Sequence, residues 1–542
     1  MRHKIGIVAG RILLMVGMAV ASAGSQASGA QAHATITEYL GPSTCVACHE
    51  SEALEMHGSV HYQQTGPTPN VTNITGNAGK SELAFNTYCG TPTTSSRATC
   101  GGCHVSNGQY PLPVATSDQL NNIDCLMCHQ DAYKRTAAPP YTEVPVVGSD
   151  GQPSTIRVPV EDENGFYYMA DEANMTISIL EAAQTVHMPT RTSCLRCHAG
   201  ASGSDGGKRG DMSSVTADPP KSSDIHMSSA EANLTCSDCH SVGNHRVRGR
   251  GLDLRPNDSP EWFTCARCHG ENPHGDTSKT KTVSMDIHAG RVACQSCHIP
   301  TFAKDISTEV DRDWLNPQFS AAACSGQGGW KPEEIRASNV IPSYKWFDGT
   351  SYVYAMGQVP MLNADSEYAM GVPNGSVSSA DAKLYPMKEH RTITAQHDAT
   401  GELIPHSTFT FFATGDFDQA VRDGMAQAGL TGSYTLVRAH TYQTVNHGVE
   451  DDSNALECGD CHIDPLAKRP LPGGPARMNL QTELGYGLKG STDQVCTQCH
   501  REKDSKGLIA MHDRHVTSKE FDCAWCHNFS RPERGLTPVS GN

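Results

Sequence analysis

The sequence is poor in the side chains that usually build a large protein core. Of its 542 residues, 6% are aromatic and 37% are hydrophobic. After residue 32, no apolar run is long enough to cross a membrane. Positive charge is also in deficit, because 42 Lys and Arg against 58 Asp and Glu give a net charge of -16. This charge disfavours nucleic acid and anionic lipid as partners. A folded chain of this composition needs apolar material from another source.

Cysteine is abundant, and it is concentrated in one motif. Twenty of the 22 cysteines lie in ten C-x-x-C-H motifs, where composition alone predicts roughly 0.04. In this motif two thiols form thioethers to a haem, and the histidine ligates its iron. Zinc is a poor alternative, because C-x-x-C zinc pairs do not each require a following histidine. We therefore expect ten covalently attached haem c groups, whose flat apolar bodies would supply the missing core. The expected attachment residues are Cys45, Cys48, His49, Cys100, Cys103, His104, Cys125, Cys128, His129, Cys194, Cys197, His198, Cys236, Cys239, His240, Cys265, Cys268, His269, Cys294, Cys297, His298, Cys458, Cys461, His462, Cys496, Cys499, His500, Cys523, Cys526 and His527.

The histidine content agrees with six-coordinate haems. Of 26 histidines, ten follow the motifs and one lies near the N-terminus, which leaves 15 to serve as distal iron ligands. His57 and His61 are one helical turn apart and would share a face. For each histidine the alternative is a surface or supporting position. The distal candidates are His57, His61, His226, His245, His274, His288, His390, His447, His512 and His515.

The start of the chain is typical of a secretory signal peptide. Arg2 and Lys4 form a basic region, residues 12–21 are apolar, and residues 21–23 read Ala-Ser-Ala, a small-residue cleavage site. We expect residues 1–32 to be this signal, with an uncleaved anchor as the alternative. Because haem c is attached outside the cytoplasm, we expect a periplasmic protein, or one secreted further or held at the cell surface.

Periodicity is weak along most of the chain. The expected fold class is mainly α with extensive coil, a haem-packed core and few short strands. Residues 141–160 predict a hairpin that turns around 149–151. The motif-free segment 299–457 contains strand-like runs at 351–355 and 408–412, and a plausible helix at 417–428. A proline- and glycine-rich linker at 470–475 then leads to the last two motifs.

Lys208 lies in a glycine-rich loop shortly after the fourth motif. A neutral amine can ligate iron, so this lysine could mark one haem as different from the others. From the residues alone, a solvated basic pair of Lys208 and Arg209 is the better interpretation. Two cysteines, Cys89 and Cys324, remain outside the motifs. In an oxidising compartment they favour a disulfide, and the alternative is that Cys89 is a thiol beside the active haem.

Nine stretches together cover roughly residues 40 to 470 and resemble the octahaem cytochromes of the tetrathionate reductase family. They are Phe85-Asn-Thr-Tyr-Cys89, Cys100-Gly-Gly-Cys-His104, Asp124-Cys-Leu-Met-Cys-His129, Pro189-Thr-Arg191, Lys208-Arg-Gly-Asp211, Asp224-Ile-His-Met227, Cys294-Gln-Ser-Cys-His-Ile-Pro-Thr-Phe302, Pro342-Ser-Tyr-Lys-Trp346, and His447 with Ala455-Leu-Glu-Cys458.

The resemblance implies a periplasmic reductase in which the second haem carries lysine as its distal ligand. Lys208 occupies the position of that lysine, which reverses the interpretation from residues alone, and Cys89 occupies that of a cysteine near the active haem. Arg209 stands where the family usually has histidine. With Arg191 it would help to bind an anion, and Asp211 would orient the lysine loop. Family members are associated with tetrathionate, nitrite and hydroxylamine, so the substrate stays open.

The expected organisation is a signal peptide at 1–32, an octahaem catalytic core at 33–470 and a two-haem extension at 471–542, which the family pattern lacks. The leading hypothesis is a reductase of a small sulfur oxyanion or nitrogen oxide, fed by bis-histidine haems. The alternatives are an electron conduit without its own substrate, or the same core running oxidatively. A quinol-linked or soluble cytochrome would be the electron donor, and a homo-oligomer is compatible with the sequence.

Overall fold

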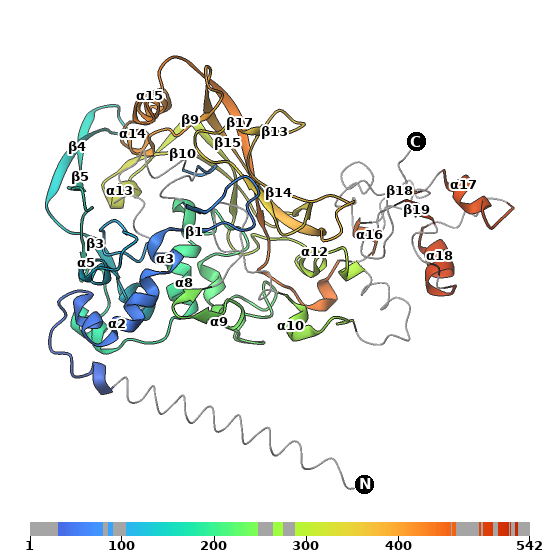
Figure 1. The fold of residues 1–542 in the computed structure, drawn as a ribbon, viewed down its shortest axis with the longest axis horizontal. Helices are drawn as coiled ribbons and strands as arrows, with labels where there is room; N and C mark the ends of the chain where they lie inside the picture. Colours follow the sequence, from blue (N-terminus) through green and yellow to red (C-terminus); the bar gives the residue numbers. More distant parts are fainter. Residues whose placement is uncertain are drawn as a thin grey trace, which may run out of the picture.

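The computed structural model describes most of the chain between residues 31 and 528. The described residues are 31–79, 85–89, 104–247, 264–274, 288–456, 458–461, 487–488, 491–501, 508–519, 521 and 526–528. The expected signal peptide, Cys100, Cys103, His462 and Cys523 lie outside them, as do the side chains of Cys324 and Cys458. Figure 1 shows two layers, with a strand-rich layer above and short helices that carry haem motifs below.

Most described haem motifs lie on or beside a single short helix. Both thiols of C-x-x-C then lie on one side of a helical turn, because residues three apart share a face. In the first motif the backbone leaves helical geometry at His49. These helices are α2 (Ser43–His57), α6 (Leu126–His129), α8 (Arg191–His198), α9 (Cys236–Cys239), α10 (Ala266–His269), α12 (Cys294–His298), α16 (Cys458–Cys461) and α17 (Thr492–Thr497).

A small apolar cluster joins the N-terminal helices. It includes Tyr62, Leu126 and Met127, and motif cysteines of the third and fourth motifs pack against it. The cluster is small because the haems are expected to supply the rest of the apolar surface. Further short elements of this region are α3 (Val60–Gln63), α5 (Ser117–Leu120), α7 (Ile179–Gln184), β1 (Thr65–Pro67), β2 (Asn77–Gly79), β3 (Arg135–Ala137), β6 (Tyr168–Ala170), β7 (Val242–Gly243), β8 (Arg246–Val247), and 3₁₀ turns at Ala201–Gly203, Ser214–Ala217 and Asp452–Asn454.

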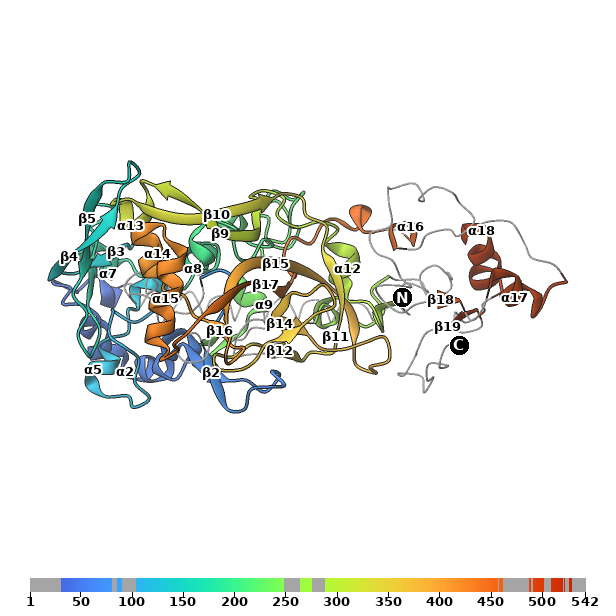
Figure 2. The same ribbon diagram turned by 90° about the horizontal axis from the view of Figure 1, so that it is seen from above.

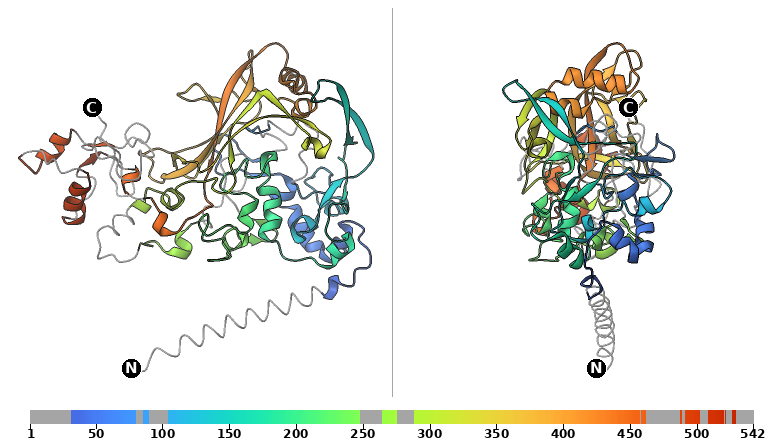
Figure 3. Two further views of the ribbon diagram at one scale, coloured as in Figure 1. Left: turned by 180° about the vertical axis from the view of Figure 1, so that it is seen from behind. Right: turned by 90° about the vertical axis from the view of Figure 1, so that its left-hand side faces the viewer.

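The hairpin expected at 141–160 is present. Strands β4 (Tyr141–Val147) and β5 (Pro153–Pro159) pair antiparallel, from Tyr141 opposite Pro159 to Val147 opposite Pro153. Its tip packs on the large sheet, because the indole nitrogen of Trp330 donates to the carbonyl of Val147 at 2.8 Å. The hairpin lies at one end of the molecule and the C-terminal elements lie at the other (Figure 3).

The motif-free segment forms a nine-stranded sheet. The order is β10-β9-β15-β17-β14-β12, with β11 and β16 paired to β15 and β13 paired to β14. The central strand β15 is antiparallel to β17 over its length and parallel to β9 at Arg391 and Thr392. The strands are β9 (Thr308–Ser320), β10 (Gly329–Ala337), β11 (Ser343–Phe347), β12 (Ser351–Val353), β13 (Met361–Leu362), β14 (Tyr368–Pro373), β15 (Lys383–His397), β16 (Leu403–Ile404) and β17 (Tyr434–Thr444).

The sheet contains more and longer strands than the sequence predicts, while the multihaem cytochrome fold itself agrees with the prediction. The reason is visible on β15, where Lys388, His390, Thr392 and Thr394 are all buried. A strand whose buried face is polar does not show the apolar alternation by which strands are recognised. The strand predicted at 351–355 is confirmed as β12.

Two helices cover one end of the sheet (Figure 2). The helix predicted at 417–428 is confirmed as α15 (Phe417–Gln427), and Asp416 caps it by accepting from the backbone of Gln419. The strand predicted at 408–412 is wrong, because Thr408–Thr414 forms helix α14. Ser407 caps α14, and Phe411 packs in an aromatic cluster with Trp314. Capping and tertiary packing therefore override the strand propensity of this aromatic run.

The remaining elements include α13 (Ala323–Gly326), beside the sheet, and the C-terminal group β18 (Gly487–Leu488), α18 (Leu508–His512), a π-helical turn (Asp513–Thr517) and β19 (His527–Asn528). Helix α16 lies between the sheet and this group (Figures 1 and 2). Among the residues described above, none of the helices combines the length and the apolar character that a bilayer crossing requires.

Candidate functional site: paired histidines and the Tyr88 pocket

Within the described residues, seven motif histidines each face a second histidine. Two imidazoles on opposite sides of one metal, each bonded at about 2 Å, have ring centres roughly 6 Å apart. The observed separations of 5.7 to 6.4 Å fit this requirement, so these residues suit six-coordinate haem. The pairs are His33–His49 at 5.9 Å, His61–His198 at 6.2 Å, His226–His269 at 6.0 Å, His240–His447 at 6.1 Å, His274–His298 at 6.4 Å, His500–His515 at 5.7 Å and His512–His527 at 6.1 Å.

Six of the ten distal candidates from the sequence face a motif histidine. They are His61, His226, His274, His447, His512 and His515. The sequence reasoning missed His33, which faces His49 from just beyond the expected signal peptide. Its place ahead of the first motif was the available signal, and no pattern reveals the contact itself.

The structure places His57 and His390 elsewhere. The ring of His57 packs on Tyr62, and its Nε2 lies 3.0 Å from the carbonyl oxygen of Leu112. The expected shared face does not form, because His57 ends α2 and His61 lies on the separate helix α3. His390 is fully buried in a polar network of the sheet.

Two further candidates have other surroundings. His245 lies 2.9 Å from the Glu55 carboxylate through Nδ1. Burial lowers the pKa of His129 in the third motif, and the charge of His245 adds to this effect. The carbonyl of His288 accepts from the backbone nitrogen of Arg291. The histidine of the eighth motif, His462, lies outside the described residues.

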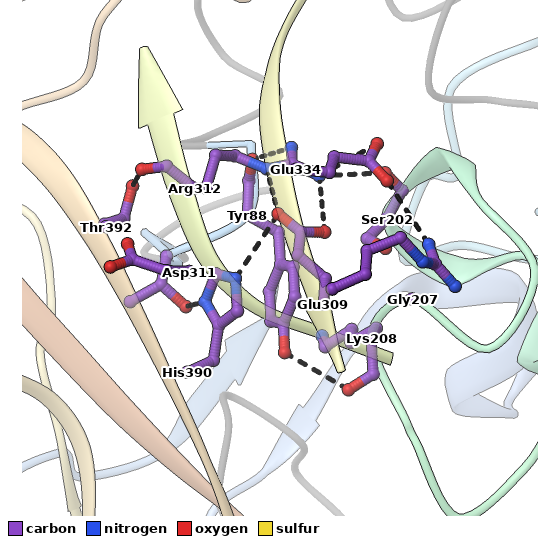
Figure 4. A network of polar contacts seen from close by, with 12 residues as sticks. Tyr88, Ser202, Gly207, Lys208, Glu309, Asp311, Arg312, Glu334, His390 and Thr392 are labelled. Carbon is purple, nitrogen blue, oxygen red and sulfur yellow. Dashed lines mark hydrogen bonds and ion pairs between the residues drawn. The ribbon is translucent and has the colours of Figure 1, made fainter. Parts of the chain in front are cut away.

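Three basic side chains surround the ring of Tyr88, and Figure 4 shows two of them, Lys208 and Arg312. Nζ of Lys208, Nζ of Lys388 and the guanidinium carbon of Arg312 lie 5.8, 5.6 and 5.8 Å from the ring centre. His390 stacks on the same ring at 3.8 Å, with 17° between the planes. The separations are within the range of cation–π attraction. We use the name Tyr88 pocket for this cluster of buried side chains, which comprises Tyr88, Lys208, Glu309, Arg312, Lys388 and His390.

Lys388 holds the loop that carries Lys208 through hydrogen bonds to the loop backbone. The ammonium group of Lys388 donates to the carbonyls of Gly207 at 2.6 Å and Lys208 at 2.9 Å, and to the hydroxyl of Thr308 at 2.5 Å. Burial lowers the pKa of Lys388 well below its usual value. When the amine is charged, its three protons match the three acceptors. The Tyr88 hydroxyl also donates to the Lys208 carbonyl at 3.1 Å. The backbone of the lysine loop is therefore fixed by two members of the Tyr88 pocket.

Glycine is required where this loop meets the sheet. A Cβ on Gly207 would lie 2.5 Å from the hydroxyls of Ser202 and Ser204. A Cβ on Gly210 would lie 2.8 Å from side-chain atoms of Phe302 and Thr308. The glycine-rich composition of the loop thus reflects close packing.

Glu309 is the carboxylate of the Tyr88 pocket. It lies 2.5 Å from Nε of Arg312 and 3.4 Å from Nε2 of His390, and its side chain is fully buried. Burial would raise the pKa of Glu309, but Arg312 and His390 hold it down at about 2. Burial lowers the pKa of His390 to about 4. The other ring nitrogen of His390 lies 2.8 Å from the hydroxyl of Thr87.

Cys89 lies at the edge of the Tyr88 pocket. Its sulfur is 3.5 Å from Nη1 of Arg312, which also donates to the carbonyl of Tyr88. The side chain of Asn86 accepts from the backbone nitrogens of Tyr88 and Cys89 at 2.9 and 3.0 Å and fixes this turn. The alternative of a disulfide involves the side chain of Cys324, which lies outside the described residues.

Asp211 and Arg209 interact with each other and with a neighbouring histidine. Nε of Arg209 lies 3.4 Å from Asp211, and the guanidinium donates to the carbonyl of Thr444. Asp211 accepts from the backbone nitrogen of Asn446 at 2.9 Å and lies 3.0 Å from Nδ1 of His447. Burial would raise the pKa of Asp211, but Arg209 and His447 hold it below its usual value. Asp211 therefore orients His447, the partner of His240, as well as the lysine loop.

Arg191 and His104 complete the set of predicted residues. Arg191 donates to the carbonyl of Met227 and the side chain of Asn233, outside the Tyr88 pocket. The carbonyl of His104 accepts from Arg135, which pairs with the buried Asp124 at 2.9 Å.

Sequence reasoning missed Tyr88, Glu309, Arg312 and Lys388. Glu309 and Arg312 lie on β9 and Lys388 lies on β15. A charged residue in a strand is ordinary when that face is solvated. The signal therefore appears only when the burial of these side chains is known.

Comparisons with known proteins agree with the motifs. The family model "Cytochrome c bacterial" matches residues 330–465, and the model "Cytochrome c554 and c-prime" matches residues 44–130. An uncharacterised protein of Archaeoglobus fulgidus is 29% identical over 251 residues, which are 40% of this chain and 78% of that protein. The crystal structure of an octaheme cytochrome c from Shewanella oneidensis aligns with a TM-score of 0.64 and 24% identity, over 87% of this chain and 99% of that one.

The structural match shows the fold of an octahaem cytochrome. The two family models and the ten attachment motifs support covalently bound haem c and a role in redox chemistry or electron transfer. Taken together, they support the conclusion that this chain is a multihaem cytochrome c.

Proposed function

We propose that the protein is a periplasmic multihaem oxidoreductase that reduces a small sulfur oxyanion or nitrogen oxide such as tetrathionate, nitrite or hydroxylamine. The catalytic haem would be attached through Cys100, Cys103 and His104, with Lys208 as its distal ligand. The observation that carries this proposal is the convergence of Lys208, Lys388 and Arg312 on the ring of Tyr88.

Charge in the Tyr88 pocket favours an anionic substrate. Lys208 and Arg312 are buried, and Glu309 pairs with Arg312 at 2.5 Å. Arg312 is largely neutralised by Glu309. Lys208 would be neutral while it ligates iron, and it would carry a charge that attracts an anion once the substrate displaces it and the amine takes up a proton. Charges in a water-poor site act more strongly than they do in bulk water. An anion that approaches Lys208 would therefore be stabilised, and so would negative charge that develops on a leaving group.

The haem would supply the electrons, and the side chains of the Tyr88 pocket would supply binding and protons. His390 is the titratable group that stacks on Tyr88, and it lies between Glu309 and Thr87. Nε2 of His390 lies 3.4 Å from the carboxylate of Glu309. The hydroxyl of Tyr88 bonds the lysine loop and so keeps the Lys208 backbone in place. Cys89 adds a polarisable thiol at the pocket edge.

Electrons would reach this haem through bis-histidine haems. The seven facing pairs support this role, and ten haems follow from the ten motifs.

The test is electron paramagnetic resonance (EPR) of the oxidised full-length protein, wild type against Lys208→Ala, with and without nitrite or tetrathionate. We expect one haem signal distinct from the bis-histidine set, lost in the variant and altered by either substrate. Lys221→Ala is the matched control, because Lys221 is 70% exposed and pairs with Glu231 at the surface. Signals that ignore both the Lys208 substitution and the substrates would contradict the proposal.

A conduit without its own substrate is the second candidate function. The two C-terminal motifs favour it, because they lengthen the haem chain beyond the eight motifs of the remainder. Uniform low-spin haems with no exchangeable ligand would support it. Running the same core oxidatively would use the same pocket, and redox potentials would decide the direction.

Periplasmic export is tested by cell fractionation and by sequencing the mature N-terminus.

A further inference from the structure

Arg196, the second variable residue of the fourth C-x-x-C-H motif, reaches across to the third motif. Its guanidinium donates through Nη1 to the carbonyl of Met127 at 3.0 Å. Through Nη2 it donates to the carbonyls of Gln130 and Asp131, both at 3.1 Å. These carbonyls lie in or directly after helix α6, which carries the third motif and ends at His129. A side chain of one motif therefore contacts the backbone of another.

Helix α6 needs partners at its C-terminal end. The last carbonyls of a helix have no acceptor role within that helix, and a helix of four residues has little intrinsic stability. Arg196 supplies three hydrogen bonds there, and the backbone nitrogen of His187 adds a fourth by donating to the carbonyl of His129 at 2.9 Å. A positive charge is also favourable at this end of a helix. Arg196 thus caps the third attachment helix.

The same end of α6 carries the histidine expected to ligate the third haem. Nδ1 of His129 lies 2.9 Å from the carbonyl of His187. This contact occupies one ring nitrogen and leaves Nε2 for iron, which is the usual means by which a protein orients a metal-ligating imidazole. Cys125 and Cys128 pack against the apolar cluster that includes Leu126. The third motif therefore fits a covalently attached haem, and Arg196 holds the backbone on both sides of its histidine.

A second contact joins the same two helices. Thr190 caps α8, which carries the fourth motif, by accepting from the backbone nitrogen of Ser193 at 3.2 Å. The Thr190 hydroxyl also donates to the carboxylate of Asp131 at 2.8 Å. Asp131 is therefore held twice by α8, through its carboxylate at the start of the helix and through its carbonyl by Arg196 in the last turn.

The two contacts differ in charge. Thr190 is neutral, whereas the guanidinium of Arg196 keeps its proton in a folded protein. The three acceptors of Arg196 are neutral carbonyls, so these bonds leave its charge in place. Arg196 is also only partly exposed, which limits screening by solvent. Positive charge near a haem stabilises the reduced iron, which carries one positive charge fewer, and so raises the reduction potential.

We propose that Arg196 is a positioning residue for the haem of the third motif. It holds α6 and His129 in place, and its charge raises the reduction potential of that haem. The variable position of one motif thereby tunes the haem of another. The inference needs haem at the third motif, but it does not depend on Lys208, on the distal ligand of the third haem or on any substrate.

The experiment compares Arg196→Gln and Arg196→Lys with the wild type in the full-length protein. Arg196→Gln removes the charge, so we expect the midpoint potential of one haem to fall in a redox titration, with the number of attached haems unchanged by mass spectrometry. Arg196→Lys keeps the charge and should retain most of the potential. Its ammonium cannot reproduce the fork of the guanidinium. Hydrogen–deuterium exchange over residues 126–131 should therefore increase in both variants.

Two controls separate charge from structure. Thr190→Val breaks the second contact without removing a charge, so it should increase exchange over residues 126–131 and leave the potentials unchanged. Arg267→Gln is the matched charge control, because Arg267 occupies the same position of the sixth motif but is exposed. Its redox titration should stay close to that of the wild type.

Several results would overturn the proposal. One is an unchanged redox titration in Arg196→Gln. Another is an equal fall of potential in Arg196→Lys or Thr190→Val, because the cause would then be a loosened structure and not a lost charge. A fall of potential without increased exchange over residues 126–131 would place the effect at another haem. Arg196→Lys also covers the case in which Arg196→Gln loses haem, because wild-type exchange in Arg196→Lys would show that Arg196 does not hold α6.

Discussion

Oδ2 of Asp211 lies 3.0 Å from Nδ1 of His447. Asp211 follows Lys208 by three residues along the lysine loop. The same carboxylate accepts from two backbone nitrogens and faces Arg209. His447 in turn faces His240 at 6.1 Å. One short segment therefore carries the proposed catalytic ligand and also orients a histidine proposed to ligate the haem of the fifth motif. This contact links the Tyr88 pocket to the electron relay.

Asp211→Asn should change the haem of the fifth motif. The substitution keeps the shape and removes the charge, so the imidazole of His447 becomes a weaker electron donor to iron. We expect the reduction potential of one bis-histidine haem to rise and activity to fall about 10-fold or more. Redox titration followed by optical and EPR spectra measures the first effect. Asp218→Asn is the control, because Asp218 bonds Ser229 at the surface. An unchanged potential in Asp211→Asn would show that this contact does not tune the haem.

Lys388→Met should loosen the lysine loop. The substitution removes three hydrogen bonds and leaves the carbonyls of Gly207 and Lys208 without this donor. A buried polar group that loses its partner costs about 1–3 kcal/mol. We expect a lower free energy of unfolding in urea and a broadened EPR signal of the haem that we propose Lys208 ligates, with all haems still attached. Lys383→Met is the matched control on the same strand, where the ammonium donates to the carbonyl of Ala289 at 2.8 Å. Equal effects in the two variants would contradict a specific role of Lys388.

Glu309→Gln should destabilise the protein strongly. Arg312 and Glu309 form a buried pair at 2.5 Å, and removing the carboxylate leaves the guanidinium charge buried. Breaking such a pair costs about 3–5 kcal/mol. Replacing both residues, with Arg312→Met added, should cost less than the sum of the single changes. Urea unfolding of the four proteins gives this coupling. Glu333→Gln, on the neighbouring strand and bonded to Asn316 at the surface, should have little effect.

Acid should destabilise the sheet through His390 and Glu309. Burial lowers the pKa of His390 in the folded state to about 4, from its ordinary value of 6.5. Between pH 6.5 and pH 4 the unfolded state therefore binds a proton that the folded state does not bind. The pKa of Glu309 in the folded state is held at about 2, below its ordinary value of 4.5. As the pH falls below 4.5, this carboxylate therefore takes up a proton in the unfolded state before it does so in the folded state. Both groups give stability that is complete above pH 6.5 and is lost as the pH falls toward 4 and then 2.

Urea unfolding between pH 7 and pH 4 tests this pH dependence. The free energy of unfolding should decrease with acid in the wild type, and His390→Gln should flatten the slope between pH 6.5 and 4. A variant with the wild-type slope would assign the acid sensitivity to other groups.

Local sequence patterns determined the covalent chemistry of this protein. Haem attachment needs two thiols and a histidine at fixed spacing, and that requirement is met within five residues of chain. The hairpin at 141–160 and the helix at 417–428 were also predictable, because turn residues, caps and apolar periodicity act over short distances. The strand-like run at 408–412 was not, because its caps and aromatic contacts decided for helix.

Tertiary structure alone decided which histidines face each other and how the Tyr88 pocket is built. His61 meets His198 and His240 meets His447 across long stretches of chain, and nothing in their spacing records it. Likewise, Lys388 on β15, Arg312 on β9 and Tyr88 in a loop meet only after the sheet has formed. Burial of charge is a property of the folded state, because the same residues would be solvated in an isolated strand. The sequence therefore predicts where haem is attached, and the fold decided which side chains face the motif histidines.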